Sequence, residues 1–441
     1  MSPNSGTTQI AVSVLCTLRL DGGFSDVKSL EAAVVEAAQG VCRDFYCQAM
    51  AAFQTAWLEG RQDRLAPIRW RSINHLTPFG MLRLPVRVVQ DKSSGRYHTL
   101  SKILWRGKAT RLLSPALEQQ AIELAAEQNY RPAARSLGRW VKTKLSHWLI
   151  WTAVQYYGAK LCHQMQRGFW AGAAGRQQAQ VVITEMDSTW VKRQQRRRPA
   201  NGPTHFPMHL GLHYTGRKRR YSRRGSTSVC LQNKCILVST DTVSVFGRRL
   251  ALAGQRLYQA SQQVVLSDGD EGLERVRQSQ FPGALWLLDR WHIAQAVRTL
   301  VTHNEAEFQR LMKPVWQADS EAVLQAIRTS PLRTQRPQEF RELFGYVLGN
   351  REGIDNWKLI PASLRRSVGT KAAPVKCGSG AVEKNIEVQI NRRFKRQGRS
   401  WNPQRADHLA QLKRLICCPK TWNTWWNRVC LTTTTVNPGW P

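Results

Sequence analysis

The acidic side chains are the first candidates for chemistry, because the chain holds only 30 Asp and Glu residues against 65 Lys and Arg. Asp187 ends the apolar run 181–187, and Asp268 ends the apolar run 264–268, directly before Gly269. Ligands of open α/β sheets bind outside the carboxyl ends of the strands, where two aspartates on neighbouring strands lie close together. Two close carboxylates stay ionised together only if a cation neutralises them. The pair therefore predicts a site for divalent metal ions.

Glu383 is the third candidate acid. It follows a glycine-rich turn and opens a predicted helix that places Glu383 and Glu387 on one face, four residues apart. Residues 376–441 hold three acids against twelve Lys or Arg, so a carboxylate kept in this segment favours a functional role. An ordinary surface ion pair of Glu383 with Lys384 or Arg392, worth under about 1 kcal/mol, is the open alternative.

Two aspartates followed by a glutamate match the acids of two-metal phosphoryl transfer. Oxygen-rich sites suit Mg²⁺ or Mn²⁺, which are held by a few carboxylates together with substrate phosphate and water. Two such ions, about 3.5 to 4 Å apart, activate the attacking oxygen and stabilise the leaving one. We therefore expect two Mg²⁺ or Mn²⁺ ions and no covalent protein nucleophile. The ten cysteines do not include two C-x-x-C motifs, so neither a zinc site nor a disulfide framework is expected.

The elements that position Asp187 and Asp268 follow an α/β pattern. The alternating and apolar runs predict strands at 180–191, 205–216, 235–247, 262–268 and 283–289, and helices at 250–263, 271–280 and 291–301. Three strands in hairpin order, followed by alternating helix and parallel strand, are the order of a ribonuclease H-like mixed sheet. Residues 303–370 are polar and helical without a strand pattern, which predicts an all-α insertion before Glu383.

Two smaller units are predicted before this sheet. Residues 29–59 indicate a helix with a break near Gly40, and residues 79–89 alternate like a strand. Three short helices follow, the first N-capped by Ser114 and the last by Ser146. These three helices are either a helix-turn-helix that reads DNA or a plain three-helix packing unit.

The predicted domain boundaries follow from these patterns. They are 1–110 for the N-terminal helical and β module, 111–170 for the helix-turn-helix-like unit, 176–302 for the first part of the core, 303–375 for the α-helical insertion, 376–416 for the last part of the core with the Glu383 helix, and 417–441 for a C-terminal tail without assigned function.

The chain is strongly basic, with a net charge of +35. Such a surplus repels itself in a compact protein and favours a polyanionic partner, most often nucleic acid. The surplus lies beyond residue 60, because residues 1–60 hold three basic and six acidic side chains. No run of 18 apolar residues occurs, so no membrane association is predicted, and reduced cysteines fit a cytoplasmic protein that joins the nucleoid when bound to DNA.

Basic side chains cluster after Asp187 and again after Glu383. Residues 188–224 hold eleven Lys or Arg and no acid. Such side chains would bind phosphates near the metal ions, with a solvated loop as the alternative for the first cluster. Trp401 suits either stacking on a base or a place in the core. The candidate nucleic-acid-binding residues are Lys192, Arg193, Arg196, Arg197, Arg198, Arg217, Lys218, Arg219, Arg220, Arg392, Arg393, Lys395, Arg396 and Arg399.

Three blocks of the sequence resemble those of bacterial insertion-sequence transposases of the ISLre type: ITEMDSTWVKRQ, LSDGDEGLERVRQSQFPGALWLLDRWHI and GSGAVEKNIEVQINRRFKRQGRSWNPQRADHLAQLKRL. The likeness covers most of residues 60–416. This resemblance implies the DDE group, with a ribonuclease H-like core and with Asp187, Asp268 and Glu383 as the catalytic, metal-binding acids. The gaps between these acids are 81 and 115 residues, the second holding the helical segment, as in the related Mutator-like transposases.

The resemblance also implies a role for His292. Asp289 and His292 look like the D-x-x-H element of Mutator-like enzymes, which adds His292 to the catalytic candidates, although a histidine between a strand and a helix also commonly serves a local hydrogen bond. The implied activity is metal-dependent cleavage of double-stranded DNA at element ends and strand transfer into target DNA by a homo-oligomer. A domesticated DNA-binding protein without catalysis and a nuclease of the same fold are the alternatives.

Overall fold

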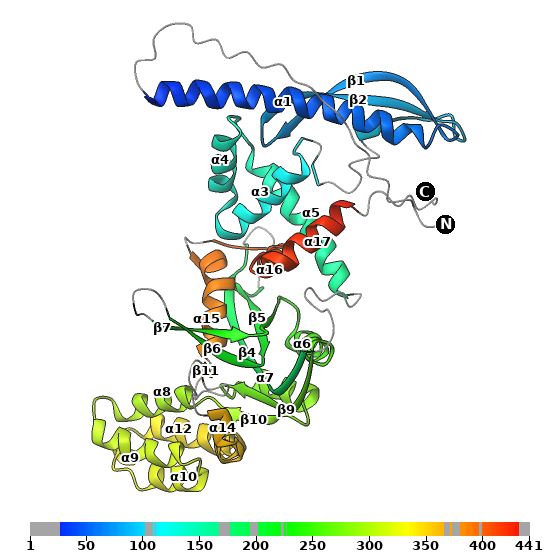
Figure 1. Ribbon diagram of the computed structural model, residues 1–441. Helices are drawn as coiled ribbons and strands as arrows, with labels where there is room; N and C mark the ends of the chain where they lie inside the picture. Colours follow the sequence, from blue (N-terminus) through cyan, green and yellow to red (C-terminus); the bar gives the residue numbers. More distant parts are fainter. Residues whose placement is uncertain are drawn as a thin grey trace. The chain divides into compact units, whose positions relative to one another are not determined.

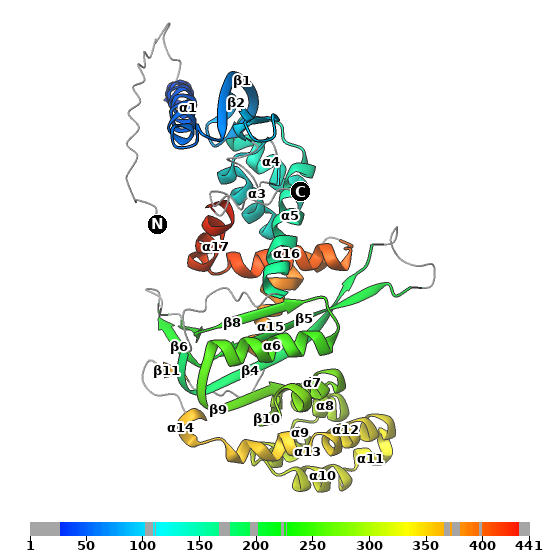
Figure 2. The same cartoon turned by 90° about the vertical axis from the view of Figure 1, so that its right-hand side faces the viewer.

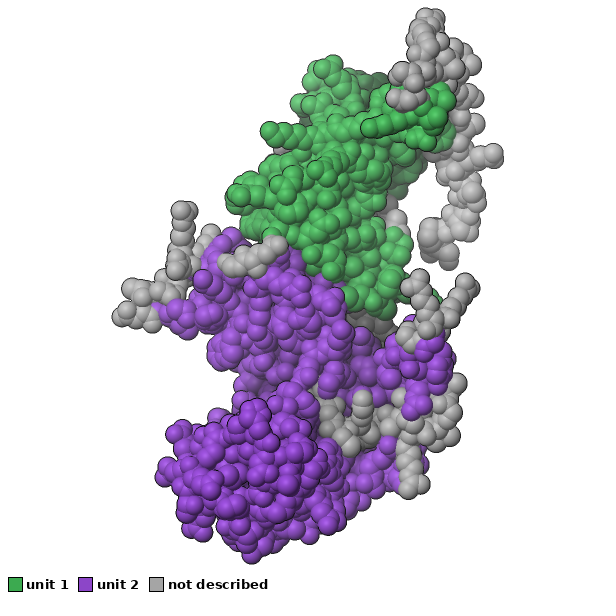
Figure 3. Space-filling model, turned by 90° about the vertical axis from the view of Figure 1, so that its left-hand side faces the viewer, with its two compact units in different colours: residues 1–161, 415–441 green, residues 162–414 purple. Residues whose placement is uncertain are grey.

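The computed structural model describes residues 27–101, 109–110, 112–166, 177–194, 202–221, 225, 227–365, 371–372, 380–396 and 399–431. The chain divides into two compact units, of which one comprises residues 1–161 and 415–441 and the other residues 162–414 (Figure 3). None of the helices in these described residues combines the length and hydrophobicity needed to span a bilayer.

The first unit opens with a helix packed on a small antiparallel sheet (Figure 1). Helix α1 (Val27–Glu59) runs unbroken through Gly40, so the predicted break is wrong. A glycine inside a helix costs only about 1 kcal/mol relative to alanine, which helix packing can offset. The sheet order is β1-β2-β3, formed by β1 (Leu65–Thr77), β2 (Gly80–Asp91) and β3 (Tyr97–Thr99).

Three further helices of this unit match the predicted three-helix pattern. They are α3 (Pro115–Glu127), α4 (Tyr130–Trp140) and α5 (His147–Gln166), followed near the end of the chain by α17 (Pro419–Leu431). The Ser114 hydroxyl accepts a hydrogen bond from the Leu117 N–H at 3.3 Å, so Ser114 is the N-cap of α3, as its position before Pro115 predicts.

The second unit is built on a mixed five-stranded sheet with the spatial order β10-β9-β4-β5-β8. Its strands are β4 (Gln177–Lys192), β5 (His205–Tyr214), β8 (Cys235–Ser239), β9 (Tyr258–Ser267) and β10 (Leu285–Leu288). Strands β4, β5 and β8 are antiparallel neighbours, whereas β9 and β10 run parallel to β4. The predicted mixed α/β architecture with many helices is thus present.

The strand predicted at 235–247 ends early, at Ser239. Helix α6 (Val243–Leu257) begins four residues later, because the alternating valines at its start belong to a helix whose buried side carries Phe246 and Leu250. A second sheet, not predicted, has the order β11-β6-β7 and comprises β6 (Gly216–Tyr221), β7 (Thr227–Gln232) and β11 (Lys371–Ala372).

Helices cover both sides of the five-stranded sheet. Figures 1 and 2 show α6 on one side and α15 (Gly380–Ile386) on the other. Helix α7 (Glu271–Gln280) connects β9 to β10, and α15 continues as a π-helix, η3 (Glu387–Lys395), before α16 (Pro403–Ile416).

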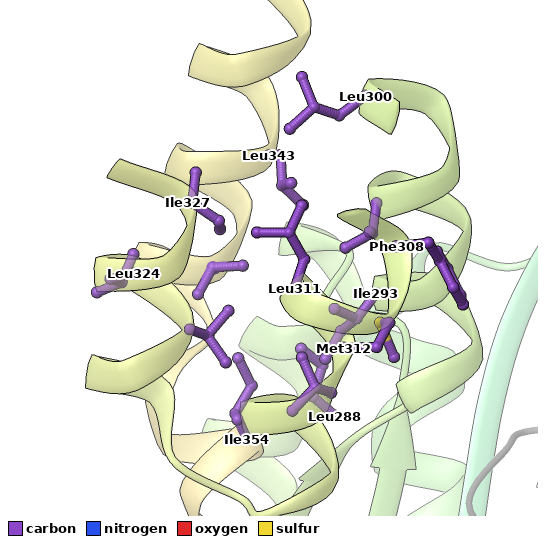
Figure 4. Close-up of a cluster of buried hydrophobic side chains, with 14 of the residues drawn as sticks. Leu288, Ile293, Leu300, Phe308, Leu311, Met312, Leu324, Ile327, Leu343 and Ile354 are labelled. Carbon is purple, nitrogen blue, oxygen red and sulfur yellow. The ribbon is translucent and has the colours of Figure 1, made fainter. Parts of the chain in front are cut away.

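A helical layer follows β10, with its own apolar core. Its members are α8 (Arg290–Val301), α9 (Glu305–Trp316), α10 (Ser320–Arg328), α11 (Leu332–Gln335), α12 (Pro337–Gly349), α13 (Arg351–Asp355), η2 (Asn356–Leu359) and α14 (Ala362–Arg365). Side chains such as Leu300, Leu311 and Leu343 fill the space between these helices (Figure 4). The layer packs against the strand ends through Leu288, so it can fix the loops that follow β9 and β10.

Candidate functional site

Aspartates from three neighbouring strands form a row at one end of the five-stranded sheet. Strands β4 and β9 are parallel, and their register, continued two residues beyond Glu185 and Leu266, places Asp187 beside Asp268. The register of β10 with β9, continued by one residue, places Asp289 next in the row. The structure therefore brings the two predicted strand-end aspartates together.

The turn that carries Asp268 is tightly held. Gly269 has a φ of +84°, and a Cβ at this position would clash with the Asn350 side-chain oxygen, so a glycine is required. The Tyr346 hydroxyl of α12 donates a hydrogen bond to the Asp268 carbonyl at 2.7 Å, and the Asp270 N–H donates to the Asp268 carboxylate at 3.0 Å. The helical layer thus helps to position the second acid.

Glu185 connects the sheet to the helix that carries Glu383. Its carboxylate is fully buried and accepts hydrogen bonds from the Tyr214 hydroxyl at 2.6 Å, the Val382 N–H at 2.8 Å and the Arg217 guanidinium at 3.4 Å. Because Glu383 directly follows Val382, this contact holds the Glu383 backbone on β4. The alternation of β4 places Glu185 on the face of Asp187, which was the only sequence signal for this contact.

The charges of Asp268 and Glu383 both act on Asp187. Burial, and after it the negative charge of Asp268 and that of Glu383, raise the pKa of Asp187 to about 6, against the Ser188 N–H and the positive charge of His292. An acid whose ionised form is disfavoured by two like charges is one that a bound cation would stabilise. Asp268 and Glu383 thus both lie near enough to Asp187 for their charges to act on it.

His292 lies between two of the carboxylates. Its Nε2 is 3.9 Å from Glu383 Oε1 and 3.7 Å from Asp289 Oδ2. Asp289 is fully buried and caps α8 by accepting a hydrogen bond from the Trp291 N–H at 2.8 Å. His292 of the D-x-x-H pair thus faces the third acid, Glu383. The backbone N–H of His292 also donates a hydrogen bond to the Asp289 carbonyl at 3.2 Å, the local contact expected at the start of a helix.

The donors of this site are hard oxygens, the type that Mg²⁺ and Mn²⁺ prefer. In the part of the chain that the structure describes, no three Asp, Glu, His or Cys side chains converge closely enough to enclose one ion. Mg²⁺ characteristically uses one or two carboxylates, completed by water and substrate phosphate, rather than an all-protein cage. The uncompensated charge around Asp187 fits that kind of site.

The first predicted basic cluster is only partly described. Lys192 ends β4, Arg193 follows it, and Lys218, Arg219 and Arg220 lie on β6. Lys192, Lys218 and Arg220 are exposed, whereas Arg193 and Arg219 are half-buried. The predicted candidates Arg196, Arg197 and Arg198 lie outside the described residues.

Two predicted phosphate-binding side chains have internal partners instead. Arg217 is 8% exposed and pairs with Glu185, and Arg393 is 1% exposed with its guanidinium 4.9 Å from the Trp401 ring centre. Burial removes both guanidinium groups from the surface that could meet a phosphate, so we correct their assignment to a structural role. Trp401 is itself buried, and its indole N–H donates to the Phe394 carbonyl at 3.1 Å, which favours the core alternative.

The remaining basic candidates lie on or just after η3. Arg392 and Arg396 are exposed and pair with Glu387 at 3.4 and 2.8 Å. The Lys395 ammonium contacts the Thr189 hydroxyl on β4, two residues beyond Asp187. Arg399 is half-buried and donates to the Arg393 carbonyl. A cationic segment thus runs along the strand that carries the first acid.

Comparison with known proteins identifies one family. The description "Uncharacterised protein family (UPF0236)" matches residues 19–417, which is most of the chain. A search of curated proteins finds no match. Among solved structures, the chain is similar to one titled "Drosophila P element transposase strand transfer complex", with a TM-score of 0.25 and 10% sequence identity over 74% of this chain and 83% of the other. A TM-score of this size establishes neither a shared fold nor a shared function.

Proposed function

The chain belongs to the uncharacterised protein family UPF0236, and for this member we propose the function of a DNA transposase of the DDE group. Asp187, Asp268 and Glu383 are separated by 81 and 115 residues in the chain. The observation that carries the proposal is that Asp187 and Asp268 stand on neighbouring strands, while Glu383 lies 3.9 Å from His292 and its charge acts on Asp187. The family resemblance of the three sequence blocks assigns the same three acids. Geometry and resemblance thus favour the same residues independently.

We further propose that the core is ribonuclease H-like. Numbered along the chain, the strands of the large sheet stand in the spatial order fifth, fourth, first, second, third. The first three strands are antiparallel neighbours and the last two are parallel to the first, which is the arrangement that the sequence pattern predicts. Helices on both sides of the sheet support this assignment.

In this proposal Asp187, Asp268 and Glu383 would hold two Mg²⁺ or Mn²⁺ ions. When bound, these ions supply activation of the attacking oxygen and stabilisation of the leaving oxygen. The protein's own part is to position the acids: Glu185 holds the Val382 N–H, and thereby the helix of Glu383, on β4. Tyr346 and Gly269 hold the backbone of Asp268 in its turn.

His292 completes the proposed site as a catalytic residue. Its ring lies 3.9 Å from Glu383 and faces the row of aspartates, where a phosphate of the DNA would enter. Protonated, the ring would balance part of the carboxylate charge and could donate a hydrogen bond to that phosphate. The adjacent Asp289 carboxylate limits how far the ring can turn away from Glu383.

The proposed partner is double-stranded DNA, both element ends and target. The surface candidates for phosphates near the acids are Lys192, Lys218, Arg220, Arg392 and Arg396, and their number would make binding salt-sensitive. We propose assembly as a homo-oligomer on DNA, because two ends must be handled together, in the cytoplasm at the nucleoid.

An Asp268→Asn variant tests the activity. We expect metal-dependent cleavage of a duplex carrying the element end to fall by more than about 100-fold, since even second-sphere partners of metal ligands contribute 10- to 100-fold. DNA affinity in EDTA should stay unchanged. Asp270→Asn is the matched control, because Asp270 lies two residues away and caps α7, a position where Asn serves equally well.

The outcomes separate the proposed function from its alternatives. Undiminished cleavage by Asp268→Asn would contradict the assignment of the acids. A wild-type protein that binds DNA but never cleaves it with Mg²⁺ or Mn²⁺ would favour the domesticated DNA-binding protein. Cleavage without joined products, when purified element ends and a target plasmid are supplied, would favour the nuclease.

A further inference from the structure

The ribbon formed by β1 and β2 carries a surface to which no function has yet been assigned. Residues 65–90 contain four arginines and no Asp or Glu. The two strands are paired from Leu65–Asp91 at one end to Thr77–Gly80 at the other, so the ribbon is regular over nearly its whole length. Its charge is therefore displayed on a rigid scaffold rather than on a loop.

One face of the ribbon is closed and the other is open. Leu84 and Val86 on β2 are buried toward α1, which packs on this strand. The opposite face carries Trp70 paired with Arg87, and the Arg87 guanidinium lies 4.1 Å from the Trp70 ring centre. Trp70 is 39% exposed, so an aromatic ring stacked with a cation faces solvent here.

Further cations surround this pair. Arg83 on β2 is exposed and lies on the same face as Arg87, four residue pairs along the ribbon. Arg69 and Arg71 on β1 pair with Val88 and Val86, so they lie on the other face from Trp70, but both are exposed at the edge of the sheet. Within the described residues of this unit, no ion pair engages Arg69, Arg71 or Arg83.

We propose that the β1–β2 ribbon is a second DNA-binding surface, which lies in a groove of duplex DNA with its arginines on the phosphates. A two-stranded ribbon fits the major groove, which is about 12 Å wide. A strand of this length spans about 40 Å, close to one turn of B-DNA. The inference rests on the proposed function only in taking DNA as the partner, because it involves none of the acids.

Protection of the sheet edge against pairing with other sheets accounts for part of this charge. Charged side chains on an edge strand prevent sheets from pairing with one another, which would explain Arg69 and Arg71. It does not explain the exposed Trp70 ring stacked with Arg87, because an aromatic ring on an edge strand adds apolar surface rather than charge. An exposed ring beside Arg83 and Arg87 on one face, with Arg69 and Arg71 along the edge, fits an extended polyanion instead.

Fluorescence anisotropy with a 40-base-pair duplex of random sequence, in EDTA, tests the ribbon. The triple variant Arg69→Gln/Arg71→Gln/Arg83→Gln should lower the slope of log K against log salt by about 2.7, since each lost phosphate contact removes about 0.9. Affinity near 0.15 M salt should fall at least about tenfold. The charge-retaining triple variant with Lys at the same positions should keep both values close to wild type.

The matched control neutralises three exposed arginines of the helical layer, Arg333→Gln/Arg341→Gln/Arg365→Gln, which changes the net charge from +35 to the same +32. Equal affinity and slope for the two Gln triples would overturn the ribbon proposal, whereas metal-dependent cleavage by the wild type would still support the proposed function. If the substitutions on β1 cause aggregation, Arg83→Gln alone, on β2, should lower the slope by about 0.9. An unchanged slope for that single variant also overturns the ribbon proposal.

Discussion

Glu185 and Asp187 lie two residues apart on one face of β4, and their surroundings are opposite. Burial raises the pKa of Glu185 to about 6. The Tyr214 hydroxyl, the Arg217 charge and the Val382 N–H act to lower it, and the Asp289 charge adds a smaller rise. Burial also raises the pKa of Asp187 to about 6, but there the neighbouring charges of Asp268 and Glu383 add to the rise. Internal donors thus outnumber the like charges around Glu185, whereas two like charges add to the effect of burial on Asp187, two residues further along β4.

This difference distinguishes Glu185, an acid that positions other residues, from Asp187, an acid suited to bind a metal ion. A carboxylate with three internal hydrogen-bond donors has little capacity left for a ligand, so Glu185 stabilises the arrangement of β4 and α15. A carboxylate close to like charges lowers the stability of the metal-free protein, and a bound cation stabilises its ionised form. The comparison predicts opposite stability changes when each carboxylate is replaced by its amide.

Asp187→Asn should have the largest effect on activity. We expect DNA cleavage to fall by more than about 100-fold, beyond the 10- to 100-fold typical of second-sphere residues. Without metal, the variant should nevertheless be more stable than wild type, by about 1 to 2 kcal/mol near pH 7, because a half-buried charge beside two like charges is removed. Cleavage assays and urea unfolding in EDTA measure the two quantities.

Metal provides the control for this variant. Mg²⁺ should raise the unfolding midpoint of the wild type but leave that of Asp187→Asn nearly unchanged, since stabilisation by a ligand follows its affinity for the native state. A variant that is less stable than wild type in EDTA would show that the Ser188 N–H and His292 outweigh the repulsion by Asp268 and Glu383, and the contrast between the two acids would then be lost.

Glu185→Gln should lower stability instead. The substitution leaves Arg217 buried without its counter-charge, and breaking a buried pair in this way costs about 3 kcal/mol. Cleavage should fall by about 10- to 100-fold through displacement of the Glu383 helix, and higher Mg²⁺ should restore part of it. DNA affinity in EDTA should stay at the wild-type value. A general loss of folded protein would lower this affinity, so the measurement distinguishes displacement of the Glu383 helix from unfolding.

A double-mutant cycle isolates this pair. Arg217→Gln combined with Glu185→Gln should be less destabilising than the sum of the single changes, because no uncompensated charge remains. Additive effects would mean that Glu185 and Arg217 are not energetically coupled, and the positioning role would then rest on Tyr214 and Val382 alone.

The sequence predicted Asp187 and Asp268 better than the residues that hold the site together. Asp187 and Asp268 follow apolar runs, and a strand-end acid is a local pattern that a single sequence displays. Glu185 was visible on the same face, but its partners Tyr214, Arg217 and Val382 come from β5, β6 and α15. Such contacts depend on tertiary packing, which the sequence pattern does not encode locally.

The same limit explains the errors in the elements and the basic residues. Gly40 indicates a helix break only where packing does not oppose it, and α1 packs on β2. Arg217 and Arg393 belong to strongly basic runs, and the charge of a run does not reveal which of its members turns inward. The strand order of the large sheet was predictable in outline, since it follows from the alternation of strand and helix.

Of the predicted changes, replacement of His213 should have the smallest effect at neutral pH. It tests how the buried part of the sheet beside β4 responds to a proton. His213 is fully buried on β5, where its Nδ1 is 2.9 Å from the Thr184 hydroxyl of β4 and its Nε2 is 2.9 Å from the Leu250 carbonyl. Burial lowers its pKa to about 4. Between pH 6.5 and 4 the unfolded chain therefore binds more protons at this histidine than the native state does, so its contribution to stability is present above pH 6.5 and is lost as the pH falls.

The relevant measurement is the difference in unfolding free energy between wild type and His213→Gln, because Glu185 and Asp187 titrate alike in both proteins. The wild type should lose about 2 kcal/mol relative to the variant between pH 7.5 and pH 5, with no further change above pH 7.5. His213→Asn, which also cannot titrate, should give the same pH profile. A difference that stays constant from pH 7.5 to 5 would mean that His213 accepts its proton without unfolding, and the buried sheet around His213 would then tolerate a new charge as readily as the surroundings of Asp187.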